Sequence, residues 1–199
     1  NMYNRFILFA AFIILSIYNS GISAENIITV SPTSGSDNSN LSEALEKASK
    51  YNGKPVTISL KPGIYDFSRA ESSEKIYYVS NTTSEEENPE PLKHIALLLE
   101  GMKNVTIDGC GSTLLMTGEM TSFVFDKCKN IVFKNINIDN SNPTQTEMTV
   151  RENGKDYLIA EVHPTSKYRI EQDRLVWYGD GWSFSGGIAQ SYDYVSDMT

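Results

Sequence analysis

The chain has 199 residues, of which 40% are hydrophobic and 21% charged, and its net charge is −8. This length suits one large domain or two small ones. The acidic balance argues against nucleic acid or an anionic membrane surface as a partner, so we expect neither.

Residues 1–24 have the pattern of a secretory signal. Arg5 supplies a positive charge, an apolar run follows from Phe6 to Ile17, and small or polar residues lead to Ala24. An apolar run of about a dozen residues is too short to span a bilayer comfortably. We therefore expect cleavage near Ala24, no stable membrane span afterwards, and a secreted or periplasmic protein.

The mature chain is predicted to begin with a short strand at residues 27–30, a loop and one helix. Asn40 is a favourable N-cap, and Glu43 follows three residues later, close to a capping box. The helix is expected to end near Gly53, since glycine accepts a left-handed backbone. One apolar face recurs at helical spacing, formed by Leu41, Ala44, Leu45 and Ala48.

Two strands joined by a Pro-Gly turn follow the helix. Apolar residues alternate with polar ones over 56–60, as in a half-buried strand, and residues 64–67 resume a strand after the turn. This order resembles the start of the pectin-lyase-like right-handed parallel β-helices, in which the helix plugs the open end. Residues 68–93 are expected to form a charged surface loop around a strand at 76–80.

The segment IALLLEGMKNVTIDGC at 95–110 is repeated as TSFVFDKCKNIVFKNI at 121–136, an offset of 26 residues. Apolar residues match apolar residues at every second position. A solenoid has this pattern, because each strand buries one face and stacks on its copy one coil later. The matched pairs are Leu97 with Phe123, Leu99 with Phe125, Val105 with Ile131 and Ile107 with Phe133.

Two asparagines occupy equivalent positions in the repeat. Asn104 and Asn130 fall where the chain is expected to turn a corner. Asparagine tolerates unusual backbone angles and forms local hydrogen bonds. Stacked in register, the two side chains could also bond to each other.

The two cysteines do not follow the repeat. Cys110 and Cys128 lie 18 residues apart, and the repeat places Cys128 at the apolar position of Met102. We interpret both as core thiols, with a disulfide between them as the alternative. No CxxC or Cys/His cluster indicates a metal, so we expect neither a metal site nor a cofactor.

The repeat ends after Asp139. The segments EMTV and YLIAEVHP flank RENGKD as in a β-hairpin, and YRIEQDRLVWYGDGW has the same form with Gln172 and Asp173 near its turn. We interpret 141–185 as an inserted antiparallel module, part of a β-barrel. Residues 186–199 would begin the return to the solenoid. A solenoid needs a closed end, and none follows, so we expect a truncated sequence.

The predicted fold is therefore mainly β. It comprises a signal peptide at 1–24, a capping helix with the first coils of an incomplete right-handed parallel β-helix at 25–140, the inserted module at 141–185, and a truncated return at 186–199.

Carboxylates are the residues here that suit hydrolysis of a glycosidic bond, which needs one acid and one base or nucleophile. Glu100 and Asp126 stack in the repeat, where like charges would repel, and Asp108 and Asp139 each follow a coil strand. We interpret all four as solvated corner residues, and leave the catalytic residues unassigned. The two histidines, His94 and His163, are expected to be structural or on the surface.

The aromatic residues of WYGDGW are the candidate sugar-binding residues. Trp177 and Trp182 could stack on sugar faces, because their rings are large, rigid and amphipathic. The interpretation we favour places them in the core of the inserted module or at its boundary with the solenoid.

Several motifs occur in a characteristic order: GIYDF, YYVSN, IALLLEGMKNVTIDGCGSTL, NIVFKNINIDNSNPTQ, YRI and GDGWSF. In this order they resemble the N-terminal part of glycoside hydrolase family 110, exported enzymes that remove terminal α-1,3-linked galactose. The resemblance implies a β-helix with inserted barrels, a galactose-terminated glycan as partner, and inverting hydrolysis by Asp carboxylates. It also implies that those acids lie beyond residue 199, so the fragment should be inactive alone.

Two alternatives stay open. A polysaccharide lyase of this fold would need Ca²⁺ and a basic residue on the coil face, where Lys103, Lys129 and Lys134 lie. A non-catalytic carbohydrate-binding or surface protein would need only the scaffold and an aromatic binding face.

Overall fold

The computed structural model describes residues 26–78, 86, 91–143, 145–186 and 190. The predicted signal at 1–24 and most of the segment 186–199 lie outside these residues, so those predictions stay untested. Within the described part, no helix is both long and apolar enough to cross a membrane. The described chain is mainly β, as predicted.

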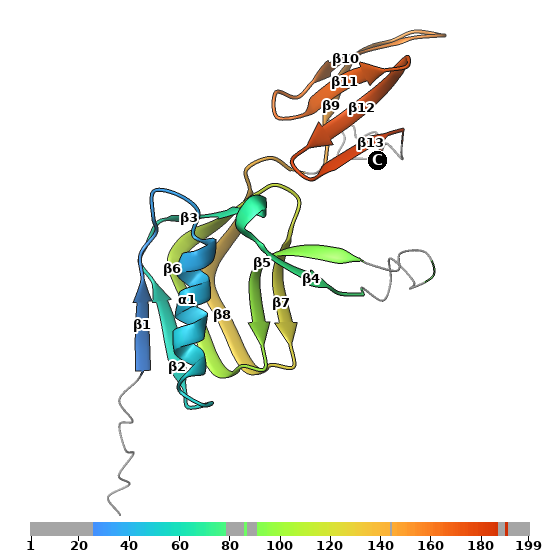
Figure 1. The fold of residues 1–199 in the computed structure, drawn as a ribbon. Helices are drawn as coiled ribbons and strands as arrows, with labels where there is room; N and C mark the ends of the chain where they lie inside the picture. Colours follow the sequence, from blue (N-terminus) through green and yellow to red (C-terminus); the bar gives the residue numbers. More distant parts are fainter. Residues whose placement is uncertain (1–25, 79–85, 87–90, 144, 187–189, 191–199) are drawn as a thin grey trace, which may run out of the picture.

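At the centre of the fold, two successive strand pairs lie in parallel register (Figure 1). We call β5 with β6 the first coil and β7 with β8 the second, because β7 pairs with β5 and β8 pairs with β6. Leu97 pairs with Phe123 and Val105 with Ile131, which confirms the register predicted from the repeat. The bounds are Leu92–Glu100 for β5, Lys103–Thr117 for β6, Thr121–Asp126 for β7 and Lys129–Asn140 for β8.

Three earlier strands continue the stack on the N-terminal side. β1 (Asn26–Val30) pairs parallel with β2 (Val56–Leu60), which pairs with the first half of β6. β3 (Ile64–Ser68) pairs parallel with the second half of β6. All three strands were predicted, and each contributes buried residues to one core, among them Val30, Ile58 and Phe67.

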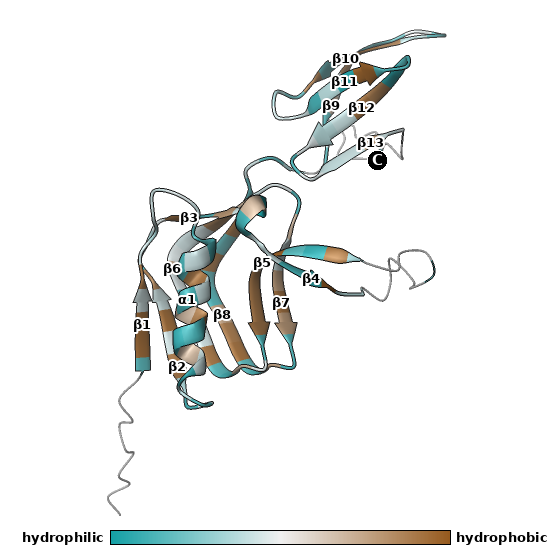
Figure 2. Ribbon diagram, in the orientation of Figure 1, coloured by the Kyte–Doolittle hydropathy of each residue, from teal (hydrophilic) through white to brown (hydrophobic). Residues whose placement is uncertain are grey.

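The predicted helix covers the N-terminal side of this stack. α1 spans Asn38–Ser49 and contacts β1, β2, β3 and β5 (Figure 1). Its apolar face is buried in the same core cluster as the strands, as its spacing predicted, and Figure 2 shows the alternation of hydrophobic and hydrophilic residues along the strands behind it. The buried face consists of Leu41, Ala44, Leu45 and Ala48.

The predicted N-cap was wrong. The helix begins two residues before Asn40, and Asp37 occupies the N-cap position without making a side-chain cap. The carboxylate of Asp37 is fully buried and accepts hydrogen bonds from the backbone N–H groups of Thr33 and Asp66. Asn40 instead donates to the carbonyl of Ser31 at 2.7 Å and to Asp37 at 3.0 Å. Both residues therefore tie the helix to its neighbouring loop and strand.

Tyr65 is the buried polar contact between the first strands. Its side chain has no exposed surface, and its hydroxyl lies 2.9 Å from the carbonyl oxygens of Val30 and Lys61. Burial raises the pKa of Tyr65 to about 12. The phenol therefore stays protonated up to strongly alkaline pH, and its single O–H can donate to either of these carbonyls.

The charged loop holds a strand earlier than predicted. β4 spans Ser73–Ile76 and pairs antiparallel with β5, whereas the prediction placed a strand at 76–80; residues 79 and 80 lie outside the described part. A short 3-10 helix, η1 (Arg69–Glu71), leads into β4, and the hydroxyl of its N-cap Ser68 accepts from the N–H of Ala70.

The two predicted hairpins are present after residue 147. β9 (Met148–Asn153) pairs with β10 (Leu158–Val162), and β11 (Lys167–Glu171) pairs with β12 (Arg174–Gly179). A further strand, β13 (Trp182–Ser185), pairs with β12. The described strands of this module form a two-stranded and a three-stranded sheet, with no closed barrel among them.

The turn between β12 and β13 rests on the coils through a small seam around Arg69. The N–H of Glu119 donates to the carbonyl of Asp180 at 2.8 Å. A Cβ added to Gly118 would lie 2.8 Å from Cβ of Arg69 and 2.5 Å from the carboxylate of Asp180. A Cβ added to Gly181 would overlap the guanidinium side of Arg69. The seam therefore depends on two positions without side chains.

We predict that Gly109→Ala destabilises the coil stack. A Cβ at this position would lie 2.5 Å from the backbone oxygen of Asn135 on β8 and would overlap the Ile136 side chain. Relieving such a contact costs about 1–3 kcal/mol of unfolding free energy, measurable by urea denaturation. Gly35→Ala is the control, since nothing lies within 4 Å of its added Cβ. Equal unfolding midpoints for the two variants would contradict the packing.

We predict that Gly181→Ala loosens the hairpin module. The added methyl group displaces Arg69 and so weakens the contact between the hairpin module and the coils. Limited proteolysis should then cleave the connection at 141–147 roughly several-fold faster than in the wild type. The matched control is Gly186→Ala, because Gly186 also has a positive φ of 77° but nothing within 4 Å of its added Cβ. If both variants are cleaved at one rate, backbone strain explains the effect and the seam does not.

Candidate functional site

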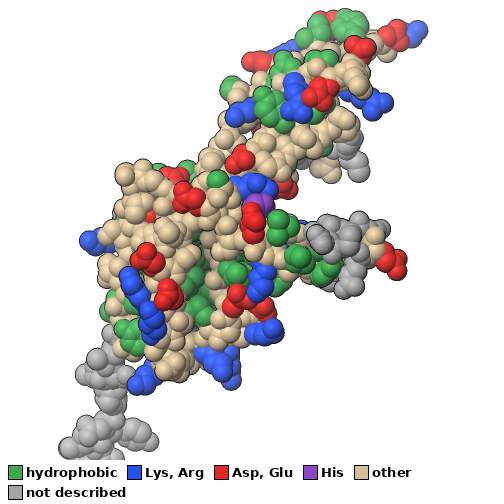
Figure 3. Space-filling model, in the orientation of Figure 1, with side chains coloured by type: hydrophobic (Ala, Val, Ile, Leu, Met, Phe, Trp, Pro, Cys, Tyr) green, Lys and Arg blue, Asp and Glu red, His purple; other side chains and the backbone are tan. Residues whose placement is uncertain are grey.

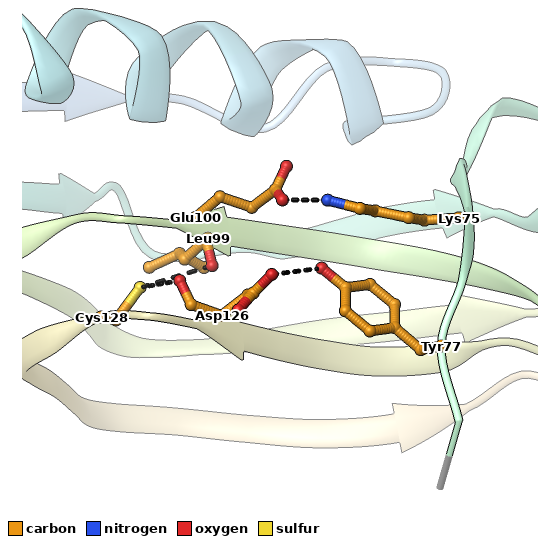
Figure 4. Close-up of polar contacts among 6 residues, drawn as sticks. All are labelled: Lys75, Tyr77, Leu99, Glu100, Asp126 and Cys128. Carbon is orange, nitrogen blue, oxygen red and sulfur yellow. Dashed lines mark hydrogen bonds and ion pairs between the residues drawn. The ribbon is translucent and has the colours of Figure 1, made fainter.

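The stacked acids Glu100 and Asp126 are paired across β5 and β7, as the repeat predicted. Each has a different partner from the segment that begins with β4 (Figure 4). Lys75 forms an ion pair with Glu100, and the hydroxyl of Tyr77 donates to the Asp126 carboxylate at 3.1 Å. Repulsion between the two acids is thus offset by one positive charge and one hydroxyl donor.

Tyr77 contacts Lys75 through its ring and Asp126 through its hydroxyl. The ammonium group of Lys75 lies 5.2 Å from the centre of its ring, within the range of a cation–π contact. Desolvation raises the pKa of the Tyr77 phenol, and its hydrogen bond to Asp126 also raises it. The hydroxyl therefore stays protonated near neutral pH and donates to Asp126, while its oxygen can accept from Lys75.

The two thiols are free, and one of them was wrongly predicted. Cys128 is half-buried against the core, and its Sγ donates to the carbonyls of Leu99 at 3.3 Å and Asp126 at 3.4 Å (Figure 4). Cys110, predicted as a core thiol, is exposed. It lies at a corner with a φ of 49°, where the chain turns its side chain away from the core.

Asp108 is the centre of a polar cluster on the outer face of β6 and β8. Its carboxylate accepts from the amide of Asn135 at 2.9 Å and from the backbone N–H of Cys110 at 3.1 Å. The ammonium of Lys134 lies 3.1 Å away. Ser59 pairs with Asp108 in the parallel register, and its hydroxyl lies 3.6 Å from the Cys110 thiol.

These contacts decide what Asp108 can do. The hydrogen bond from Asn135 contributes most, followed by those from Cys110 and Lys134, and together they lower the pKa of Asp108 to about 2. A glycosidase acid must stay protonated at working pH, which requires a raised pKa. Asp108 is therefore ionised and unsuited to be the acid, and its lone pairs are committed to structural donors.

The other predicted residues are dispersed. Asp139 is exposed and accepts from the N–H of Asn140. Nδ1 of His94 lies 3.2 Å from the Ser72 hydroxyl and 3.5 Å from Glu74, and Nδ1 of His163 lies 2.8 Å from the Thr165 hydroxyl. Among the described contacts, neither imidazole forms a hydrogen bond or an ion pair with Glu100 or Asp126.

The candidate sugar-binding tryptophans lie on one face of the sheet β11–β12–β13. Trp177 is only 6% exposed and meets Tyr168 edge-on at 5.9 Å between ring centres. Trp182 is half-buried and stacks on Phe184 at 5.6 Å. Tyr168 and Phe184 themselves are exposed, and Figure 3 shows hydrophobic side chains on the surface of this module. An aromatic face is therefore present, with Trp182 more accessible than Trp177.

Sequence reasoning missed Lys75 and Tyr77 as partners of the acids. Lys75 lies in the segment predicted as loop and Tyr77 in the strand predicted at 76–80, and nothing in the repeat connects β4 to β5. The alternation of charge in SSEKIYY is the only signal, and it does not indicate a partner strand.

In the part of the chain that the structure describes, no group of three His, Cys, Asp or Glu could hold a metal ion.

No protein-family model matches the chain. The chain is 62% identical over 173 residues to α-1,3-galactosidase A of Bacteroides thetaiotaomicron, covering 87% of this chain and 30% of that protein. It is 32% identical to α-1,3-galactosidase B of the same organism, over 92% of this chain and 28% of the relative. It is 31% identical to α-1,3-galactosidase A of Bacteroides fragilis, over 68% of this chain and 22% of that protein. The chain spans less than a third of the length of each.

We predict that Asn135→Ala raises the pKa of Asp108 toward its usual value near 4. A lowered pKa means that the ionised form stabilises the fold above about pH 4, and this contribution is lost as the pH falls toward about 2. The Asn135→Ala variant should lose this stabilisation at a higher pH than the wild type. Carboxyl ¹³C NMR titration measures the shift.

The control for this titration is Asn137→Ala. The amide of Asn137 donates to the carbonyl of Gly111 and makes no hydrogen bond to Asp108 in the described structure. An unchanged Asp108 pKa in Asn135→Ala, or an equal change in both variants, would show that the amide is not the main cause.

Proposed function

We propose that this chain is the N-terminal part of an exported glycoside hydrolase that removes terminal α-linked galactose. The observation that carries the proposal is the 62% identity over 87% of the chain to a protein named α-1,3-galactosidase A. Identity at this level over 173 residues supports a shared fold and a shared reaction class. Residues 1–24, with their signal-like pattern, support export and cleavage near Ala24.

The scaffold in this proposal is the right-handed parallel β-helix of glycoside hydrolase family 110. Three features support it: parallel pairing at an offset of 26 residues, the hydrogen bond between Asn130 and Asn104, and a helix over the first coil. The hairpin module then corresponds to an insertion between coils. A solenoid accepts such insertions, since each coil contacts only its neighbours.

The proposed chemistry is inverting hydrolysis with a bound water. One carboxylic acid protonates the leaving oxygen, and a carboxylate on the other side of the sugar ring activates the water. The acids described here are held by Lys75, Tyr77 and Asn135, so we assign the catalytic pair to later parts of the full-length protein. The chain alone then supplies scaffold and no catalyst.

Carbohydrate binding without catalysis is the second candidate function. The aromatic face of β11–β12–β13, where Trp182 stacks on Phe184 and Tyr168 is exposed, favours it. Aromatic rings stack on the apolar faces of sugars, and galactose has such a face. Calorimetric binding of a galactoside to this chain, lost in Trp182→Ala, distinguishes this candidate from a scaffold alone.

We predict that the full-length protein releases galactose from an α-1,3-linked galactoside, with β-galactose as the first anomer in ¹H NMR, because an inverting enzyme reverses the anomeric configuration. A β-linked galactoside should not be cleaved, and the present chain alone should release nothing from either substrate. Absence of release by the full-length protein would reject the activity, and α-galactose as the first product would reject inversion.

A further inference from the structure

The tripeptide Asn-Gly-Lys occurs twice, at residues 52–54 and 153–155. Asparagine is a thermolabile residue. A following glycine makes it more reactive, because glycine has no side chain to keep its backbone nitrogen away from the asparagine amide. Since the labile pair and the residue after it are the same in both copies, a large difference in their reactivity has to come from the fold.

The reaction at such a pair is deamidation through a succinimide. The backbone nitrogen of the glycine loses its proton to base and bonds to Cγ of the asparagine, and the bond between Cγ and the amide nitrogen breaks. The amide nitrogen takes up a proton and leaves as ammonia. Water then opens the ring at either carbonyl, which gives aspartate or isoaspartate. Nothing is oxidised or reduced, and water is the only co-reactant.

The second copy is locked in the hairpin of β9 and β10. Asn153 is the last residue of β9 and pairs with Leu158 on β10. The N–H of Gly154, the group that would attack, donates to the carbonyl of Tyr157 at 2.9 Å. The Tyr157 ring also lies against Gly154, since a Cβ added there would lie 2.6 Å from its Cζ. Ring closure at Asn153 therefore requires the hairpin to open.

The first copy lies in the turn between α1 and β2 (Figure 1). The N–H of Lys54 donates to the carbonyl of Tyr51 at 3.0 Å, and Asn52 and Gly53 lie between them with φ of 52° and 79°. Asn52 is exposed. Among the described residues, neither its side-chain amide nor the N–H of Gly53 has a hydrogen-bond partner. Ring closure at Asn52 therefore needs a rotation within the turn and breaks no strand pair.

The turn at Asn52 supports the two stacked asparagines. The carbonyl of Gly53 accepts from the amide of Asn104 at 2.7 Å, and the side-chain oxygen of Asn104 accepts from the amide of Asn130 at 2.8 Å. Isoaspartate continues the chain through its Cγ, so one extra carbon enters the backbone directly before Gly53. The Gly53 carbonyl is then displaced, and the amide of Asn104 loses its acceptor.

We propose that Asn52 is a deamidation site, whereas Asn153 is protected by its hairpin. Modification of Asn52 adds a negative charge to the turn between α1 and β2. Its isoaspartate form also breaks the hydrogen bond by which this turn holds Asn104 of β6. The site is independent of the proposed glycosidase function, because the reaction needs only water and base.

The test follows both copies in one sample of the full-length protein at mildly alkaline pH. Peptide mass spectrometry measures the modified fraction of each copy from a mass increase of about 1 Da. In the folded protein, Asn52 should be modified at least about tenfold faster than Asn153, because opening a hairpin is less frequent than rotation within an exposed turn. In concentrated urea the two rates should become similar.

Equal rates in the folded protein, or faster modification of Asn153, would overturn the proposal. A difference that persists unchanged in urea would also overturn it, because the neighbouring residues would then set the rate and the fold would not.

Two variants test the effect on the stacked asparagines. Asn52→Gly removes the amide and accepts the positive φ without strain. Asn52→Asp supplies the negative charge without the extra backbone carbon. On prolonged incubation, the unfolding midpoint should fall in the wild type and stay constant in Asn52→Gly, and freshly prepared Asn52→Asp should unfold close to the fresh wild type.

Two outcomes would reject the displacement of the Gly53 carbonyl. One is an unchanged unfolding midpoint in wild-type protein that has been modified at Asn52. The other is freshly prepared Asn52→Asp that is already as unstable as the modified wild type, since the charge alone would then explain the loss.

Discussion

Parallel stacking of equivalent positions, 26 residues apart, is the constraint on which this structure depends. When Leu97 pairs with Phe123 and Ile107 with Phe133, the inward positions of successive layers fill one continuous core. The same register brings Glu100 next to Asp126 and Asn104 next to Asn130. Stacking therefore creates an electrostatic cost at one corner and a hydrogen bond at another.

The corner at which Glu100 lies next to Asp126 is stabilised by residues that do not belong to the stacked strands. Lys75 and Tyr77 come from a segment that runs antiparallel to β5, so they can reach two layers at once. A surface ion pair contributes little by itself, about 0–1 kcal/mol. Its effect here is to fix which carboxylate meets which donor, and this leaves the acids of the corner unavailable for chemistry.

Sequence reasoning succeeded where periodicity carried the information. The strands of both coils, the buried face of α1 and both hairpin turns follow from alternation, helical spacing and turn residues. It failed where tertiary contacts decide the outcome. Asp37 replaced Asn40 at the N-cap because its carboxylate also binds the backbone of Asp66 on β3, a residue 29 positions away. Cys110 is exposed because it lies out of phase with the buried positions Val105 and Ile107 of β6, an alternation that the comparison of the two cysteines did not use.

The candidate site shows the same division. The stacking of Glu100 on Asp126 could be predicted, whereas their partners could not, because no repeat relates β4 to the coils. The accessibility of Trp182 relative to Trp177 depends on how the face of β11–β12–β13 is covered, which the composition of WYGDGW does not encode.

The position of α1 has a consequence for how such a chain acquires its structure. The helix closes the N-terminal end, which is the end synthesised first, so the earliest layer has a completed apolar surface on which the next layer can assemble. Quasi-one-dimensional folds propagate from neighbour to neighbour. A layer that stacks on this closed end therefore needs contacts only with the layer before it.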